Sequence, residues 1–124
     1  MSENTNCPKP GAFSWNELVS NDVALANKFY TGLFGWTAEP FDANYTLFKK
    51  DNAVVGGLMK CPQPGLPSHW LPYVTVEDVD ASAAKAKTLG AQVVAGPFDV
   101  PNVGRIAVLL DPHGAAIGLF KPKM

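Results

Sequence analysis

The fold of this chain is read from one stretch, DPHGAAIGLFK at residues 111–121. Its Asp-Pro and His-Gly pairs predict a tight turn over residues 111–114, because proline fixes φ and glycine admits positive φ. The short apolar run that follows, Ala115–Phe120, predicts a strand. A weaker copy of the stretch, DNAVVGGLMK, stands at residues 51–60, and its GLMK aligns with the GLFK that begins at Gly118. The chain therefore contains an internal repeat.

Both halves of the chain show the same order of elements: strand, helix, strand, strand, strand. Residue alternation and helical spacing predict strands at 13–19, 36–38, 45–48 and 53–59 with a helix at 23–33, and strands at 70–76, 91–94, 104–110 and 115–120 with a helix at 79–89. Pro40 and the Gly96-Pro97 pair are expected to interrupt strands. A proline-rich linker at 61–69 separates module one, about 12–60, from module two, about 70–122. Each half is too small to bury its own sheet, so two must pack together, either within the chain or between chains.

Composition limits the classes of function. The 124 residues are 47% hydrophobic and 17% charged, which argues against disorder, and the net charge of −1 gives no electrostatic case for nucleic acid or an anionic membrane as partner. No apolar run approaches the ~20 residues of a spanning helix, and Met1–Gly11 lacks the apolar core of a signal peptide. We therefore expect a cytoplasmic protein. Cys7 and Cys61 each precede a proline; we expect thiols, with a disulfide between them left open.

The motifs themselves run along almost the whole chain. They are WxEL at 15–18 with Asp22, AxxFYxxLFGW at 26–36, YVxVxDVD at 73–80, VGR at 103–105 and DPxGA at 111–115. This set, in a duplicated βαβββ order, resembles the vicinal oxygen chelate superfamily, which includes glyoxalase I, extradiol dioxygenases, and fosfomycin- and bleomycin-resistance proteins. The likeness is nearest to the glyoxalase-like branch, often found as tandem copies. It implies one α+β domain over 1–124, in which two βαβββ modules form a cupped mixed sheet, and it implies a homodimer.

Metal-dependent members of that superfamily hold a divalent ion with His or Glu from the first and last strands of each module. Carried onto this chain, those positions fall on Trp15, Gly57, approximately Leu71, and Gly118. An indole only donates hydrogen bonds, and leucine and glycine have no ligating side chain, whereas divalent ions need oxygen or imidazole ligands. The resemblance therefore implies neither a metal nor a cofactor here.

Two charged residues are candidates for chemistry. Glu17 lies two residues beyond Trp15, on the same strand face. It is either an acid or base whose pKa is raised by desolvation among aromatic residues, or a carboxylate at the rim of the cup, paired with Arg105 or a backbone amide. Arg105 either clamps an anionic ligand or forms an ion pair with an acidic neighbour.

The two histidines, His69 and His113, are the remaining titratable candidates. His113 is expected in an exposed turn, and His69 stands just before a strand, where it could reach a cavity. Nothing in their spacing predicts a two-histidine metal site.

Large side chains are placed where a ligand could lie. Trp15, Met59, Tyr73 and Phe120 occupy registers that face the cup, and the glycines at 57 and 118 leave room there; alternatively, side chains simply fill the cup. Phe34 and Trp36, at a helix-to-strand junction, are expected in the core instead.

Three hypotheses for function follow. In the first, the protein binds or sequesters a small, partly aromatic or apolar molecule in its cup, as bleomycin-resistance proteins do. In the second, it is an enzyme of the lyase, isomerase or hydrolase type, with Glu17 as general base and Arg105 as anion clamp. In the third, the proline-rich linker and exposed aromatic residues serve a protein partner.

Overall fold

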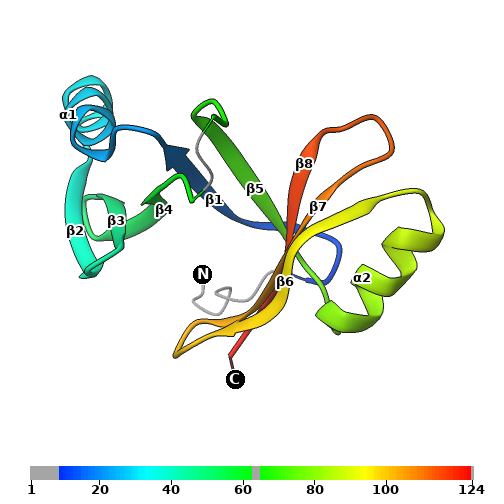
Figure 1. Ribbon diagram of the computed structural model, residues 1–124. Coiled ribbons are helices and arrows are strands. Elements are labelled where there is room, and N and C mark those ends of the chain that lie inside the picture. Colours follow the sequence, from blue (N-terminus) through cyan, green and yellow to red (C-terminus); the bar gives the residue numbers. More distant parts are fainter. Residues whose placement is uncertain (1–8, 63–64, 124) are drawn as a thin grey trace. The chain divides into compact units, whose positions relative to one another are not determined.

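A computed structural model describes residues 9–62 and 65–123 of the chain, with eight strands and two helices in the order predicted from the repeat (Figure 1). Internal contacts divide it into two compact units. The N-half unit is Trp15–Leu71; the C-half unit is formed by the described residues up to Ser14 together with those from Pro72 onward. The boundaries fall inside β1 (Phe13–Ser20) and β5 (His69–Thr75). The assignment of modules at 12–60 and 70–122 stays a prediction about the repeat.

In the N-half unit, one helix covers one face of a four-stranded mixed sheet. The elements after β1 are α1 (Val23–Phe34), β2 (Thr37–Asp42), β3 (Tyr45–Lys50) and β4 (Ala53–Lys60). Their order across the sheet is β2-β3-β4-β1, with β1 parallel to β4 and the other pairs antiparallel. The side chain of Asp22 accepts a hydrogen bond from the backbone N–H of Leu25 at the start of α1, and Gly35 ends the helix at φ 71°.

The core of this unit lies between α1 and the sheet. Leu18, Phe48 and Leu58 are buried there, and partly buried residues of α1 pack against them together with Trp36. The expectation that Trp36 belongs to the core is confirmed. The same expectation for Phe34 is wrong, because Phe34 is 49% exposed, although its ring centroid lies 4.9 Å from that of Trp36.

The C-half unit repeats the plan with smaller core residues. After β5 come α2 (Val79–Thr88), β6 (Gln92–Val100), β7 (Gly104–Leu110) and β8 (Ala116–Pro122). The strand order is β5-β8-β7-β6, and β5 is parallel to β8. The core cluster consists of Val79, Ala83, Ala107, Leu109 and Leu119, from α2, β7 and β8.

Two predicted strand breaks are wrong. β2 continues through Pro40, and β6 continues through Gly96 and Pro97. Both are the outermost strands in their units, where proline costs no ladder hydrogen bond on its outward side. Register shifts after Pro40 and between Ala95 and Phe98 absorb the irregularity as bulges. The predicted turn at 111–114 is confirmed: the Asp111 carboxylate accepts hydrogen bonds from the backbone N–H of His113, within the turn, and from that of Ala115, directly after it.

Neither helix in the described residues is both long and apolar enough to cross a membrane.

Candidate functional site

The helix-free face of the N-half sheet carries the residues of greatest chemical interest. In the parallel pairing of β1 with β4, Glu17 stands beside Gly57 and Val19 beside Met59. Leu18 and Leu58, between them, point into the core under α1. Because side chains alternate along a strand, Glu17, Gly57 and Met59 lie on the opposite face, together with Trp15. All four residues therefore lie on the helix-free face of this sheet.

A chain of hydrogen bonds crosses this face. The indole Nε1–H of Trp15 donates to the hydroxyl of Tyr45 at 3.0 Å, and that hydroxyl donates to Oε1 of Glu17 at 2.9 Å. Glu17 is 8% exposed, whereas Trp15 and Tyr45 are partly buried. A buried carboxylate must be hydrogen-bonded to be tolerated, and Tyr45 provides such a bond. The arrangement holds a hydroxyl and a carboxylate in fixed relation on one surface.

Gly57 makes room for this arrangement. A Cβ at position 57 would overlap the hydroxyl end of Tyr45, so any side chain here would displace it. The sequence interpretation that Gly57 leaves open room is therefore wrong in this unit: the space exists, but the tyrosine from β3 occupies it.

The helix-free face of the C-half sheet has a different composition. Tyr73 of β5 stands beside Gly118 of β8, and Thr75 stands beside Phe120. The ring of Tyr73 lies where a Cβ of Gly118 would be, so this glycine too is covered by a tyrosine and leaves no open space. Thr75 is 4% exposed, and its Oγ1 is the buried side-chain oxygen or nitrogen that finds no hydrogen-bond partner within the described ranges.

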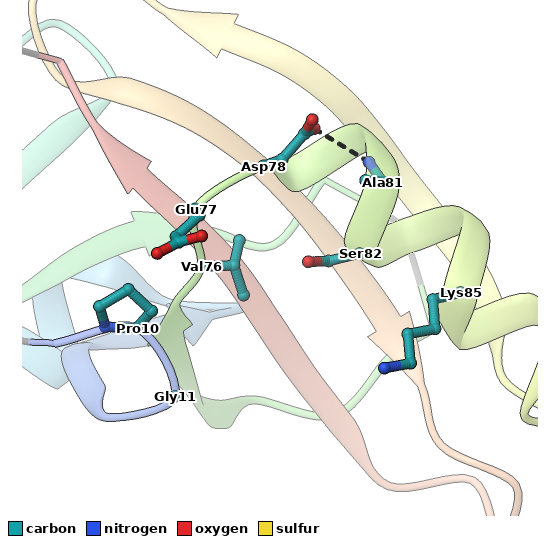
Figure 2. A pocket seen from close by; sticks show the side chains of 8 residues that line it. All are labelled: Pro10, Gly11, Val76, Glu77, Asp78, Ala81, Ser82 and Lys85. Carbon is teal, nitrogen blue, oxygen red and sulfur yellow. Dashed lines mark hydrogen bonds between the residues drawn. The ribbon is translucent and has the colours of Figure 1, made fainter.

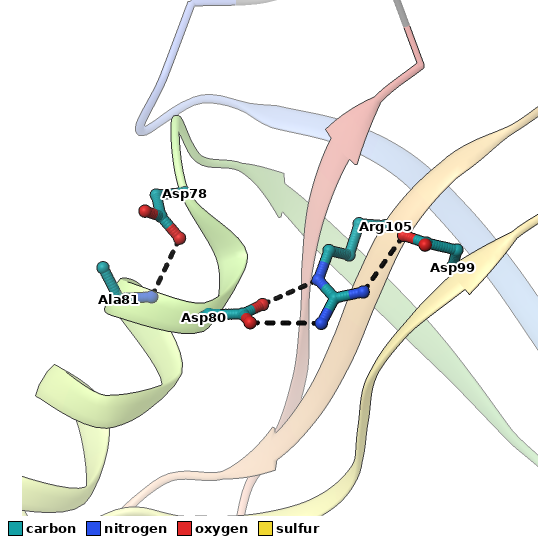
Figure 3. A network of polar contacts seen from close by, with 5 residues as sticks. All are labelled: Asp78, Asp80, Ala81, Asp99 and Arg105. Atoms are coloured by element: carbon teal, nitrogen blue, oxygen red, sulfur yellow. Dashed lines mark hydrogen bonds and ion pairs between the residues drawn. The ribbon is translucent and has the colours of Figure 1, made fainter.

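Arg105 lies on the other face of the same sheet, under α2. It pairs with Lys121 across β7 and β8, in line with Ala107 and Leu119 of the core and not with Phe120. Its guanidinium binds Asp80 of α2 through Nε (2.7 Å) and Nη2 (3.1 Å), and Asp99 of β6 through Nη1 (3.1 Å), as Figure 3 shows. The hydrogen bond with Asp80 lowers the pKa of that carboxyl group and, with the bond to Asp99, raises the pKa of Arg105. Of its two predicted roles, the ion pair is the one present.

His69 and His113 lie in different units of the chain. His113 is exposed in the predicted turn, and Nδ1 of His69 lies 2.9 Å from the backbone oxygen of Pro67. Cys61 is buried, and Cys7 lies outside the described residues, so their state stays a prediction.

Two shallow hollows of about 350 Å³ each lie in the C-half unit. Figure 2 shows the first, at the start of α2, bordered by Pro10, Glu77, Ser82 and Lys85. The backbone N–H of Ala81 there is already satisfied by the side chain of Asp78. The second hollow adjoins Arg105, at the end of β8. Arg105 is the one residue predicted for a site that lines either of these two hollows.

The positions at which the resemblance implies metal ligands do not fit a divalent ion. Trp15 commits its N–H to Tyr45, Leu71 is buried, and the glycines at 57 and 118 are overlaid by tyrosines. Within residues 9–62 and 65–123, no three His, Cys, Asp or Glu side chains group together as a metal site would require.

Sequence reasoning missed Tyr45 and Thr75. Tyr45 was recognised only as the start of a strand, although its place opposite Met59 puts it on the helix-free face. A signal existed in the glycine at 57, since a residue without a side chain on a sheet often marks close approach by another group. Thr75 gave no signal, because alternation alone does not reveal an unpartnered hydroxyl.

Comparison with known proteins identifies the class to which this chain and its fold belong. The profile of the Glyoxalase/Bleomycin resistance protein/Dioxygenase superfamily matches residues 12–119, and the chain belongs to that superfamily. The resemblance predicted from the motifs, and the α+β fold that it implies, are confirmed.

Two curated relatives match most of this chain. The chain is 46% identical over 116 residues to "Putative glyoxylase CFP32" of Mycobacterium tuberculosis, covering 90% of this chain and 44% of that protein. It is 37% identical over 130 residues to the anthracycline biosynthesis protein DnrV of Streptomyces peucetius, covering 90% and 47%. The chain thus spans less than half the length of the curated relatives that it matches.

Solved structures support the fold alone, because their sequences are distant. The Mn(II)-bound glyoxalase of Novosphingobium aromaticivorans superposes with a TM-score of 0.62 at 19% identity, covering 91% of this chain and 39% of that one. Homoprotocatechuate 2,3-dioxygenase of Brevibacterium fuscum superposes with a TM-score of 0.66 at 21% identity, covering 95% and 34%.

Proposed function

We propose that this chain is a glyoxalase-like protein that binds a small, partly aromatic or apolar molecule without a divalent metal. The observation that carries the proposal is the hydrogen-bonded set on the helix-free face of the N-half sheet, Trp15 Nε1 to Tyr45 to Glu17. An indole, a phenol ring and the thioether of Met59 offer flat and polarizable surface, and the buried carboxylate beside them supplies orientation. In the C-half unit, Tyr73 and Phe120 would add apolar and aromatic contact only, because the Tyr73 ring covers Gly118.

The relatives support an aromatic ligand. One of them takes its name from anthracycline biosynthesis, and the superfamily takes part of its name from bleomycin resistance and from dioxygenases. Ligands with ring systems suit a surface built from Trp15, Tyr45 and Met59. The donor set of the implied metal positions (Trp15, Gly57, Leu71, Gly118) favours binding over metal-assisted chemistry, since none of these side chains ligates a divalent ion.

The experiment measures metal and ligand separately. Elemental analysis of protein purified without chelator should find no stoichiometric divalent ion, and added Mn²⁺ should leave the melting temperature unchanged. Calorimetric titration with an anthracycline and with bleomycin should give saturable binding to at least one. Trp15→Phe, which removes the indole N–H, should weaken that binding, whereas the matched change Trp70→Phe, on the α1 side of the unit, should not. A tightly held metal ion, or the absence of binding by both probes, would contradict the proposal.

A second candidate is an enzyme of the lyase, isomerase or hydrolase type with Glu17 as general base. The observation in its favour is that Glu17 is buried and held by the Tyr45 hydroxyl, as a positioned base would be. This candidate does not use Arg105, whose guanidinium is bound to Asp80 and Asp99 in the C-half unit. Glu17→Gln separates the candidates: unchanged ligand affinity with no turnover by the native chain supports the binder, whereas turnover that disappears in the variant supports the enzyme.

A further inference from the structure

The helix-free face of the N-half sheet carries more negative than positive charge. The row of residues through Gly57 runs from Glu39 on β2, past Leu47 on β3, to Glu17 on β1. Lys49 is two residues along β3 from Leu47, so it lies on the same face, where its Nζ forms an ion pair with Oε1 of Glu39 at 2.7 Å. Because that pair is neutral as a whole, the carboxylate of Glu17 leaves this row negative.

A bulge in β2 adds an aromatic ring and a further carboxylate beside Tyr45. The pairing of β2 with β3 shifts between Pro40 and Asp42, so that Phe41 and Asp42 together stand opposite Tyr45. The rings of Phe41 and Tyr45 form a T-shaped pair, with centroids 6.4 Å apart and planes at 82°. Oδ1 of Asp42 accepts a hydrogen bond from the backbone N–H of Asn44, which holds this second negative charge at the Tyr45 end of the face.

Aromatic rings and a carboxylate on one face are the groups that recognise a positive charge. The faces of indole, phenol and phenyl rings, here Trp15, Tyr45 and Phe41, are electrically negative and attract cations. Glu17 is 8% exposed, and its hydrogen bond from the Tyr45 hydroxyl does not neutralise its charge, because the hydroxyl is itself neutral. A buried charge is better tolerated beside an opposite one, so a cation would lower a cost that a neutral molecule would leave in place.

We propose that the ligand of this face is an organic cation, a molecule with an aromatic or apolar body and an ammonium or similar positive group. The inference rests on the proposed function, because it names the class of ligand for the same face. The apolar body would lie against Trp15 and Met59, with the positive group toward Glu17. An anionic ligand is disfavoured, since Arg105, the cation expected to clamp one, belongs to the C-half unit and is bound to two aspartates.

The experiment compares three probes that share one ring system and differ in charge. The full chain is titrated with naphthylmethylammonium, naphthylmethanol and naphthoate, and the shifts of its amide NMR signals give each dissociation constant. The ammonium compound should bind roughly tenfold more tightly than the neutral alcohol, because cation–π attraction and the Glu17 carboxylate act on the cation alone. Naphthoate should bind most weakly, because its charge has the same sign as that of the face.

Glu17→Gln removes the charge and keeps the shape of the side chain. The dissociation constant of the ammonium compound should rise roughly tenfold, toward that of the alcohol, because the ion pair with the ligand is lost. The affinity for the alcohol should change little, since glutamine can still accept a hydrogen bond from the Tyr45 hydroxyl. The charge of Glu17, separately from its place in the fold, is what this variant measures.

Lys49→Gln keeps the proposal testable if Glu17→Gln fails to fold. Loss of this ammonium group leaves the charge of Glu39 unmatched, so the ammonium probe should bind roughly threefold more tightly, while the alcohol binds as before. Lys50→Gln is the matched control. It changes the net charge of the chain equally, but Nζ of Lys50 lies 3.5 Å from the backbone oxygen of Phe34 at the end of α1, on the other face of the sheet. It should alter neither affinity.

Several results would overturn the choice of a cation and leave the proposed function standing. They are equal binding of the ammonium compound and the alcohol, tighter binding of naphthoate, and a preference for the cation that Glu17→Gln and Lys49→Gln leave unaltered. An equal gain in Lys50→Gln and Lys49→Gln would also overturn it, because the effect would then come from net charge alone. If none of the three probes binds, the inference fails, and the titrations with an anthracycline and with bleomycin decide the proposed function separately.

Discussion

The two units place a tyrosine over a glycine at corresponding points of the repeat, but they do so by different routes. In the N-half unit, Tyr45 reaches over Gly57 from a separate strand, β3, so that only its hydroxyl end meets the glycine. In the C-half unit, Tyr73 belongs to β5, directly beside Gly118, and the body of its ring covers the glycine. The Tyr45–Gly57 pair thus places a hydroxyl group on the helix-free face of the N-half sheet. The Tyr73–Gly118 pair instead covers the corresponding face of the C-half sheet with a ring.

That difference concentrates polar chemistry in the N-half unit. The position on β1 that corresponds to Tyr73 is Glu17, which pairs with Gly57 as Tyr73 pairs with Gly118. A carboxylate there needs a hydrogen-bond donor, and Tyr45 is such a donor. The proposed ligand would therefore be oriented mainly by the N-half unit.

The largest expected effect comes from giving each glycine a side chain. Gly118→Ala should destabilise the protein by about 3 kcal/mol, the upper end for overpacking, because the overlapped Tyr73 ring is anchored close to its own backbone. Gly57→Ala should cost less, about 2 kcal/mol, because the overlapped atom is the far end of the Tyr45 side chain, which can swing aside but gives up its hydrogen bonds in doing so. Denaturant unfolding of both variants measures the difference.

Glycine at an open position provides the control for these variants. Gly65 has no atom near its Cβ position but a φ of +90°, so Gly65→Ala reports backbone strain without crowding. If Gly57→Ala proves as costly as Gly118→Ala, Tyr45 is as rigidly held as Tyr73, and the contrast between the units is lost.

Much of the fold could be predicted from the sequence because periodicity and turn chemistry act locally. The Asp111 turn, the helix starts at Asp22 and Asp78, and the alternation that puts Trp15 and Glu17 on one face all follow from neighbours a few residues apart. The extension of β6 through Pro97 could not be predicted, because it depends on the strand being outermost in its sheet.

The site was only partly predictable for a related reason. Glu17 was a candidate because an acid among aromatic residues is unusual, but its partner Tyr45 lies 28 residues away. That Gly57 and Gly118 stand where the resemblance implies ligating residues remains a prediction. Whether the space beside each glycine is open or filled depends on how far the side chains of other strands extend over it. Residues near the glycine in the sequence give no information about that. The assignments as a binding site, a cytoplasmic protein and a homodimer stay predictions.

A smaller effect should follow from removing one hydroxyl. Tyr45→Phe takes a hydrogen bond from the buried Glu17 carboxylate and another from the Trp15 N–H, which should destabilise the protein by about 1–2 kcal/mol. In a cycle with Glu17→Gln, the two changes should not add, because they act on one hydrogen bond. Tyr30→Phe is the control, since its hydroxyl accepts from Trp70 at the exposed surface. Additive losses in the cycle would show that Tyr45 and Glu17 are not coupled.

The smallest effect concerns acid and should arise in the C-half unit. The backbone N–H groups of Ala115 and His113 lower the pKa of Asp111 below its ordinary 3.8, and Arg105 lowers the pKa of Asp80. A carboxyl group whose pKa is lower in the folded state contributes stability above its unfolded pKa and loses it as the pH falls through the folded value. The native protein should therefore lose stability below a pH of about 3.8. Asp111→Asn and Asp80→Asn should each flatten that dependence, and the double variant should flatten it further, because the two carboxylates have separate partners. Urea unfolding at a series of acidic pH values measures the slope, and an unaltered slope in Asp111→Asn would mean that the turn carboxylate does not stabilise the C-half unit through its charge.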